Sequence, residues 1–125
     1  EAAVPRKAKR FMNAGMGWNY IAMEQAIRDA GLEAKEITGE RTGIIMGSGG
    51  PSTKAIVAAA DTTRSRGPSK IGPFEVPKAM SSTASATLAT PFKIRGVNYS
   101  ISSACATSST ASACGSCGSS TSAPP

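Results

Sequence analysis

Two short apolar runs constrain the fold of this chain more than any other feature. Residues 44–46 (Ile-Ile-Met) are typical of a short buried strand, and residues 97–101 alternate apolar and polar side chains, as a strand does. A glycine precedes each run, and segments with helical spacing precede and separate the two runs. Strands that alternate with helices in this way predict an α/β fold with a parallel or mixed sheet.

Helical patterns surround the two predicted strands. Residues 14–30 carry apolar side chains at steps of three and four, and Gly31 is well placed to end that helix. After the first strand and the sequence Gly-Ser-Gly-Gly at 47–50, Pro51 suits the first turn of a helix that continues to about Ser65. The apolar face of the first helix comprises Met16, Tyr20, Met23, Ile27 and Ala30.

The remaining segments differ in their content of proline, glycine and alanine. Residues 32–41 form a polar connection, and residues 66–77, with three prolines and two glycines, predict a loop. The alanine-rich residues 78–92 predict a further helix whose small side chains allow close packing against a neighbour. We therefore expect the order helix, strand, helix, helix, strand.

The C-terminal residues have a different composition. From Ala106 to Pro125 every residue is Ala, Ser, Thr, Gly, Cys or Pro, and the last charged residue is Arg95. Such a segment has no apolar face able to offset the entropy lost on ordering. We divide the chain into residues 1–109 and a small-residue tail at 110–125. A flexible linker is one interpretation of the tail, and letters that stand for unidentified side chains are another.

Charge and cysteine content narrow the class of protein. The 125 residues suffice for one modest domain, and 14 Lys and Arg against 8 Asp and Glu give a formal charge of +6. This charge favours an acidic partner, although ordinary solubilising surface charge is an equally good interpretation.

No window approaches the roughly 18 apolar residues of a membrane span. Three cysteines without a paired framework, and no signal peptide, favour a reducing compartment, the cytoplasm.

Two short motifs are weak candidates for chemistry. The Gly-Ser-Gly-Gly sequence lacks the Gly-Lys-Ser/Thr ending of a phosphate loop, so a turn that lets another segment approach the backbone is favoured. Cys114 and Cys117 form a CxxC, but the chain has no histidine and no second CxxC to complete a zinc site. A thioredoxin-like redox role expects the motif to open a helix after a strand, whereas this CxxC lies in the tail.

Cys105 is the strongest candidate for a reactive side chain. A strand that ends near Ser103 would deliver this cysteine at a tight turn, where Ala104 and Ala106 leave space for a substrate. Backbone N–H groups at the start of a following helix would stabilise a thiolate and the oxyanion formed when it attacks a thioester. A buried structural cysteine is the alternative on pattern alone.

Four long segments carry a family resemblance: RFMNAGMGWNYIAMEQAIRDAGL, GIIMGSGG, KIGPFEVPKAMSS and LATPFKIRGVNYSISSACATSS. They resemble the β-ketoacyl-[acyl carrier protein] synthases, specifically the synthase I group of bacterial fatty acid synthesis. They occur in the same order and with similar gaps as in the N-terminal half of that family, from about Val4 to Ser109. Synthase II and polyketide ketosynthases usually carry Thr-Ala-Cys in place of Ser-Ala-Cys at the cysteine.

The resemblance implies a partial thiolase-like fold, part of the N-terminal αβ half of a layered αβαβα architecture, with residues 1–109 as a partial N-terminal ketosynthase domain. It implies that Cys105 accepts an acyl chain as a thioester. Malonyl-[acyl carrier protein] then decarboxylates and attacks that thioester to give 3-oxoacyl-[acyl carrier protein]. The backbone N–H of Cys105 would be half of the oxyanion hole.

Further residues take roles by the same resemblance. One pair would line the acyl pocket, three basic residues would receive the acidic acyl carrier protein, and part of the second strand would pair across the two-fold axis of a homodimer. We expect no metal, no cofactor, no nucleic acid and no membrane partner. The residues are Met80 and Gly49 for the pocket, Arg6, Lys7 and Arg10 for docking, and Asn98, Tyr99 and Ser100 for the dimer.

The chain also departs from the family. Synthase I enzymes use two histidines and a lysine from the second half of the fold for decarboxylation and condensation, and this chain has no histidine. They also continue after Ala-Thr-Ser with a helix of larger residues, whereas Thr110 and the small-residue tail follow here. We expect these 125 residues alone not to catalyse condensation. The alternative function is a catalytically incomplete fragment or degenerate paralogue that acts only in binding or dimerisation.

Overall fold

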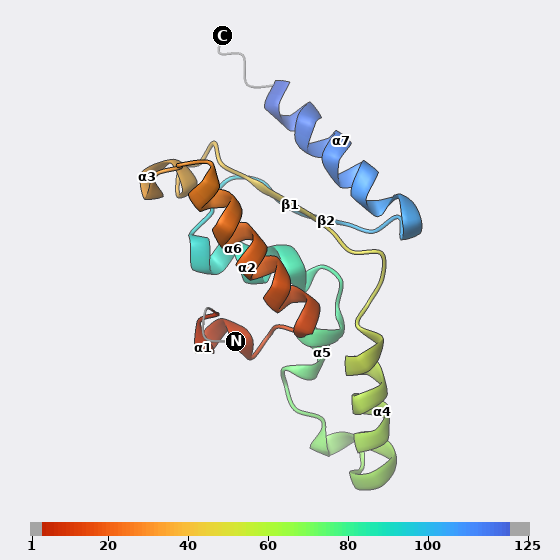
Figure 1. The fold of residues 1–125 in the computed structure, drawn as a ribbon. Coiled ribbons are helices and arrows are strands. Elements are labelled where there is room, and N and C mark those ends of the chain that lie inside the picture. The colour runs from red at the N-terminus through yellow and green to blue at the C-terminus, as the bar shows by residue number, and fades with distance from the viewer. Residues whose placement is uncertain (1–3, 121–125) are drawn as a thin grey trace.

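The computed structural model describes residues 4–120 of the chain, and side chains as far as residue 116. Helices α1 (Arg6–Lys9), α2 (Ala14–Asp29) and α3 (Ala34–Ile37) precede strand β1 (Ile44–Gly47). Helices α4 (Thr53–Arg66), α5 (Glu75–Ala79) and α6 (Thr83–Phe92) lead to strand β2 (Asn98–Ile101), and helix α7 (Thr107–Ser120) follows (Figure 1). Short 3₁₀ helices lie at Pro68–Lys70 and Ala104–Ala106.

The two strands form a parallel pair, as the α/β pattern predicts. Ile44 lies opposite Asn98, and the register continues to Gly47 opposite Ile101. The N–H of Ser48 donates to the carbonyl of Ile101 at 3.1 Å, so the pairing extends beyond β1. The alternating run at 97–101 is less buried than its pattern indicates, because Tyr99 is 57% exposed.

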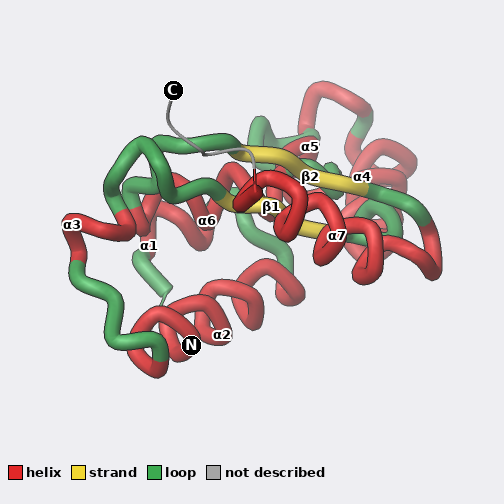
Figure 2. Tube along the Cα trace, turned by 90° about the horizontal axis from the view of Figure 1, so that it is seen from above, coloured by secondary structure: helices red, strands yellow, loops and turns green. Residues whose placement is uncertain are grey.

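Three layers surround this strand pair. Helix α6 packs on one face of the sheet with α2 behind it, and α7 covers the other face (Figures 1 and 2). The buried core lies between α2, α6 and β1, so it is concentrated on one side of the sheet. Its buried members are Met12, Met16, Tyr20, Ile44, Ala84, Leu88 and Ala89.

Helix α2 agrees closely with its sequence pattern. The Asn13 side chain caps it by accepting a hydrogen bond from the N–H of Met16 at 3.0 Å, and Gly31 follows its last turn with φ +64°. Tyr20 is buried and stacks on Phe92 with ring centroids 5.0 Å apart. Burial, and then the nearby Glu24 carboxylate, raise the pKa of Tyr20 above its usual value.

The helix predicted over 78–92 is wrong as a single element. The structure has α5 and α6 with a break at residues 80–82 between them. The Asn13 side chain donates to the Lys78 carbonyl at 3.1 Å, and the Ser52 N–H donates to the Ala79 carbonyl at 3.0 Å. Other segments therefore take the carbonyls that a continuous helix would use, so α5 ends there.

Helix α4 also begins later than predicted. Its N-cap is Ser52, whose side chain accepts from the N–H of Ala55 at 3.4 Å. Pro51 therefore lies ahead of the cap rather than in the first turn. Short helices also occupy parts of two segments predicted without regular structure, α3 within 32–41 and the start of α5 within 66–77.

The flexible-linker interpretation of the tail is wrong for residues 110–120, which belong to helix α7. This helix approaches the sheet closely because the side chains on both contacting surfaces are small. A Cβ atom placed on Gly47 would lie 2.6 Å from Cγ2 of Thr107 and 3.4 Å from Cβ of Ala111. The missing side chain at Gly47 therefore makes room for α7 on β1. None of the helices within residues 4–120 has the length and apolar character of a membrane-spanning helix.

Candidate functional site

The turn between β2 and α7 carries Cys105, as the sequence predicts. Strand β2 ends at Ile101, a 3₁₀ helix covers Ala104–Ala106, and α7 begins at Thr107. Ala104 has φ +45°, a left-handed conformation that a residue with a Cβ atom rarely adopts. The Cys105 thiol is free and exposed, so the alternative of a buried structural cysteine is wrong for this chain.

The side chain of Thr107 holds this turn together. Its hydroxyl accepts a hydrogen bond from the N–H of Ser103 at 2.8 Å and donates one to the carbonyl of Ala104 at 2.7 Å. Thr107 is itself only 5% exposed. The N–H of Cys105 lies in the first turn, where a helix provides no acceptor of its own. The arrangement therefore presents a thiol and an N–H group at the same exposed corner.

The glycine-rich loop after β1 lies against the Cys105 turn. A Cβ atom on Gly49 would lie 3.3 Å from the carbonyl oxygen of Ala104. The Ser48 hydroxyl donates to the Gly50 carbonyl at 2.8 Å and closes the loop on itself. The expectation that these glycines permit a close backbone approach is confirmed, and the approaching segment is the residue before Cys105.

Met80 lies on the other side of the same loop. Met80 and the loop together line a cavity of about 150 Å³, and the Ser52–Ala79 hydrogen bond joins the loop to the end of α5. Met80 is 47% exposed, so its side chain is only partly covered. The glycine-rich loop therefore lies between the Met80 segment on one side and the Cys105 turn on the other. An acyl-binding role for Met80 and Gly49 stays a prediction. The cavity is lined by Asn13, Gly15, Met16, Asn19, Gly47, Ser48, Gly50, Ser52, Met80, Ser81 and Ala84.

The three basic residues predicted to receive a partner lie in and just after α1. Arg6, Lys7 and Arg10 are all exposed. Helix α1 lies beside α2 and α6 and away from the β2–α7 turn in both views (Figures 1 and 2). Lys7 also lines an apolar cavity of about 600 Å³ with Phe11 and Tyr20. The structure therefore does not bring these residues together with Cys105 within the described chain.

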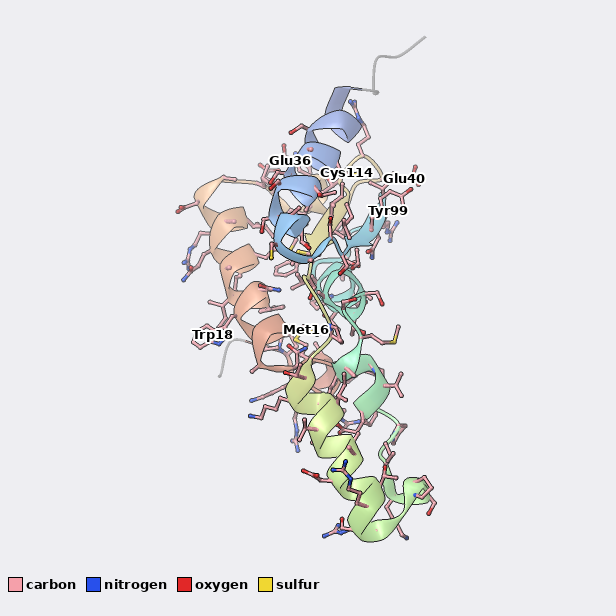
Figure 3. The ribbon with its side chains drawn as sticks, turned by 90° about the vertical axis from the view of Figure 1, so that its right-hand side faces the viewer. Met16, Trp18, Glu36, Glu40, Tyr99 and Cys114 are labelled. Atoms are coloured by element: carbon pink, nitrogen blue, oxygen red, sulfur yellow. The ribbon has the colours of Figure 1, made fainter. Side chains whose placement is uncertain are left out.

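The predicted dimer strand has one unpaired edge. In the part of the chain that the structure describes, β2 pairs only with β1. Asn98 and Tyr99 are exposed, and Tyr99 points away from the core (Figure 3). Ser100 instead faces α6, because its hydroxyl donates to the Ser85 hydroxyl at 2.8 Å and lies 3.2 Å from the Ser82 carbonyl. The dimer role stays a prediction.

The CxxC motif does not form a recognisable site. Cys114 lies half-buried on α7 (Figure 3), and the side chain of Cys117 is outside the described part. Among the described residues, no group of three His, Cys, Asp or Glu side chains is arranged to hold a metal ion. Sequence reasoning also missed two residues that shape the Cys105 turn, Thr107 and Gly47. A threonine two positions after a cysteine and a glycine at a strand end are too common to signal this arrangement.

The described chain is an α/β arrangement, a parallel strand pair between helical layers with an exposed cysteine on the turn after one strand, and it matches part of a thiolase-like fold. A β-ketoacyl synthase from Burkholderia phymatum STM815 has this fold, with a TM-score of 0.71 and 26% identity over 88% of this chain and 27% of that chain. The family described as "Beta-ketoacyl synthase, N-terminal domain" matches residues 1–116. This chain belongs to the β-ketoacyl synthase family.

Several relatives of the synthase 1 group are more similar to this chain than a synthase 2 relative is. The 3-oxoacyl-[acyl-carrier-protein] synthase 1 of Escherichia coli K12 is 53% identical over 107 residues, and that of Haemophilus influenzae is 49% identical over 106 residues. The synthase 2 of Vibrio cholerae is 32% identical over 107 residues. The two synthase 1 alignments each cover 84% of this chain and 26% of the relative, so the chain spans about a quarter of their length.

Proposed function

We propose that this chain is the N-terminal part of an acyltransferase of fatty acid synthesis, with residues 1–109 as its partial ketosynthase domain. The enzyme condenses an acyl group held on Cys105 with malonyl-[acyl carrier protein] to give 3-oxoacyl-[acyl carrier protein]. The observation that carries the proposal is the exposed Cys105 thiol on a tight turn between β2 and α7. The names of the synthase 1 relatives support the choice of substrate.

The first half-reaction uses groups that this chain contains. The Cys105 thiolate attacks the carbonyl carbon of an acyl thioester, a new sulfur–carbon bond forms, and the carbonyl oxygen gains negative charge. The Cys105 N–H stabilises that charge as one of two donors. The carrier thiol leaves as the original thioester bond breaks, and it takes up the proton given up by Cys105.

The second half-reaction needs groups that this chain lacks. Malonyl-[acyl carrier protein] loses CO₂, its carbanion attacks the Cys105 thioester, and the cysteine leaves as a thiolate. The chain has no histidine to assist decarboxylation. We propose that the remainder of a longer enzyme supplies these groups, consistent with relatives about four times the length of the matched segment.

Three surfaces would serve this reaction. Met80 and Gly49 would line the acyl-binding pocket; the cavity that Met80 shares with Ser48 and Gly50 supports the role of Met80, and the close approach of Gly49 to the Ala104 carbonyl supports its place beside Cys105. The exposed charges of Arg6, Lys7 and Arg10 would attract the acidic carrier protein, an attraction that salt weakens. The open edge of β2 at residues 98–100 would pair with a second subunit, supported by the exposed Tyr99. A cytoplasmic location stays a prediction.

A second candidate function follows from the absence of histidine in these 125 residues. A catalytically incomplete synthase fragment or degenerate paralogue would bind or dimerise without condensation. The exposed Cys105 argues against it, because a binding role gives no reason to present a thiol on a strained turn. The intact mass of the natural protein separates the two, since a mass near 12.6 kDa supports the second candidate and a much larger mass supports the first.

Replacement of Cys105 tests the proposed enzyme directly. In the full-length protein that contains this chain, we expect Cys105→Ala to lower condensation activity at least about a thousandfold, because the covalent intermediate cannot form. Cys114→Ala is the matched control, because Cys114 lies on α7 outside the turn, and it should leave the rate unchanged. Near wild-type activity of Cys105→Ala, or equal losses in both variants, would refute the assignment of Cys105.

A further inference from the structure

In the peptide unit between Ala104 and Cys105, the carbonyl group is fixed by hydrogen bonds. The carbonyl oxygen accepts a hydrogen bond from the Thr107 hydroxyl at 2.7 Å, and it also accepts the backbone N–H of Thr107. The other end of the peptide unit is the N–H of Cys105, the group that the proposed function uses to stabilise an oxyanion. Because a peptide unit is planar and trans, the direction of its carbonyl sets the direction of its N–H. The Thr107 hydroxyl, together with the Thr107 backbone N–H, therefore sets the direction of the Cys105 N–H.

The same hydroxyl also holds the preceding residue. Thr107 Oγ1 accepts from the N–H of Ser103 at 2.8 Å, so one side chain makes hydrogen bonds on both sides of Ala104. Ala104 has φ +45°, which L-residues with a Cβ atom disfavour and which persists only where the surroundings impose it. The two hydrogen bonds supply that restraint.

Packing fixes the orientation of the Thr107 side chain. Its methyl carbon occupies the space where a side chain on Gly47 would begin, 2.6 Å from an ideal Cβ position. With the methyl group against β1 and the residue only 5% exposed, the hydroxyl is directed back to the turn. One buried threonine thus connects the end of β1 to the peptide unit before Cys105.

We propose that Thr107 is a positioning residue that directs the N–H of Cys105 towards the oxyanion of the acyl-transfer step. This inference rests on the proposed function of Cys105 as the acyl acceptor. On this inference, Thr107 raises the rate of attack on a thioester carbonyl and leaves the general reactivity of the Cys105 thiol unchanged. Thr107 touches no substrate and acts only through the backbone.

Two reactions of the same thiol separate these effects. Transfer of a hexanoyl group from hexanoyl-N-acetylcysteamine forms an oxyanion at the attacked carbonyl. Alkylation by iodoacetamide forms a sulfur–carbon bond with loss of iodide and no oxyanion. Both adducts on Cys105 are followed by peptide mass spectrometry in the full-length protein, for the wild type and for the variants Thr107→Val, Thr107→Ser and Thr110→Val.

Thr107→Val keeps the shape of the side chain and removes its hydroxyl, so we expect acylation to slow about tenfold to hundredfold while alkylation changes less than about threefold. Thr107→Ser keeps the hydroxyl and should restore most of the acylation rate. Thr110→Val is the matched control, because the Thr110 hydroxyl is exposed and donates only to the Ala106 carbonyl within α7. If Thr107→Val does not fold, Thr107→Ala tests the same ratio of acylation to alkylation, because it also removes the hydroxyl.

Three outcomes would overturn the inference: unchanged acylation in Thr107→Val, an equal loss of acylation and alkylation, or an equal effect of Thr110→Val. Failure of the proposed function itself looks different. In that case, the wild-type protein forms no hexanoyl adduct on Cys105 although iodoacetamide modifies it.

Discussion

Helices α6 and α7 cover opposite faces of the same two strands with similar small residues, yet they pack very differently. Helix α6 buries Ala84, Ser85, Thr87, Leu88 and Ala89 out of its ten residues. In α7, Thr107 is the only buried residue among those whose side chains are described. One face of the sheet therefore carries the core, whereas the other carries a closely approaching helix with little apolar side-chain volume.

The difference shows two ways in which small residues serve this fold. In α6 they surround Leu88, which is 1% exposed, and let α2 and the sheet pack around it. In α7 they bring a backbone close to β1, so that Thr107 reaches both Gly47 and the Cys105 turn. The α6 side thus contributes mainly stability, and the α7 side positions the candidate nucleophile.

Truncation of the α6 core should have the largest effect. Leu88→Ala removes a fully buried side chain and leaves a cavity, so we expect a loss of about 2–5 kcal/mol in the free energy of unfolding. Urea denaturation followed by circular dichroism measures this loss. The matched change on the other face, Thr110→Ala, removes only exposed atoms and should cost less than about 0.5 kcal/mol. Similar losses in both variants would contradict the one-sided core.

Enlarging the contact between β1 and α7 should have an intermediate effect. Gly47→Ala places a methyl group against Thr107, so strand or helix must shift, and we expect a loss of about 1–3 kcal/mol. The hexanoyl transfer rate should fall as well, because the shift moves Thr107. Gly50→Ala is the control, since a Cβ atom there meets nothing within 4 Å. Equal stability of the two variants would show that α7 does not rest on Gly47.

The same alanine-to-glycine change in the two regions should give the smallest effects. Ala89→Gly lies in the buried part of α6 and should cost about 1–2 kcal/mol through lost packing and helix propensity. Ala104→Gly removes the strain of a positive φ, which offsets the greater freedom of the unfolded chain, so we expect a change below about 1 kcal/mol. Thermal denaturation compares them, and a greater loss at Ala104 would mean that its conformation is unstrained.

Local sequence signals predicted much of the fold. The spacing of Met16 and Tyr20, the cap at Gly31 and the two apolar runs correctly gave α2, β1 and β2. The long segment around Cys105 indicated both the family and the turn. The break between α5 and α6 could not be predicted in this way, because the hydrogen bonds from Asn13 and Ser52 come from residues distant in the sequence.

The sequence by itself determined the family, an α/β fold with a parallel or mixed sheet, and the position of Cys105 after a strand, because periodicity and a long matched segment are local properties of the chain. Only the tertiary structure decided that the small-residue segment is helix α7 and that Thr107 holds the Cys105 turn. The packing of α7 on β1 depends on the missing side chain at Gly47, and this contact exists only in the folded protein. Small side chains give a weak local signal for secondary structure, and they act by allowing helices and strands to pack closely.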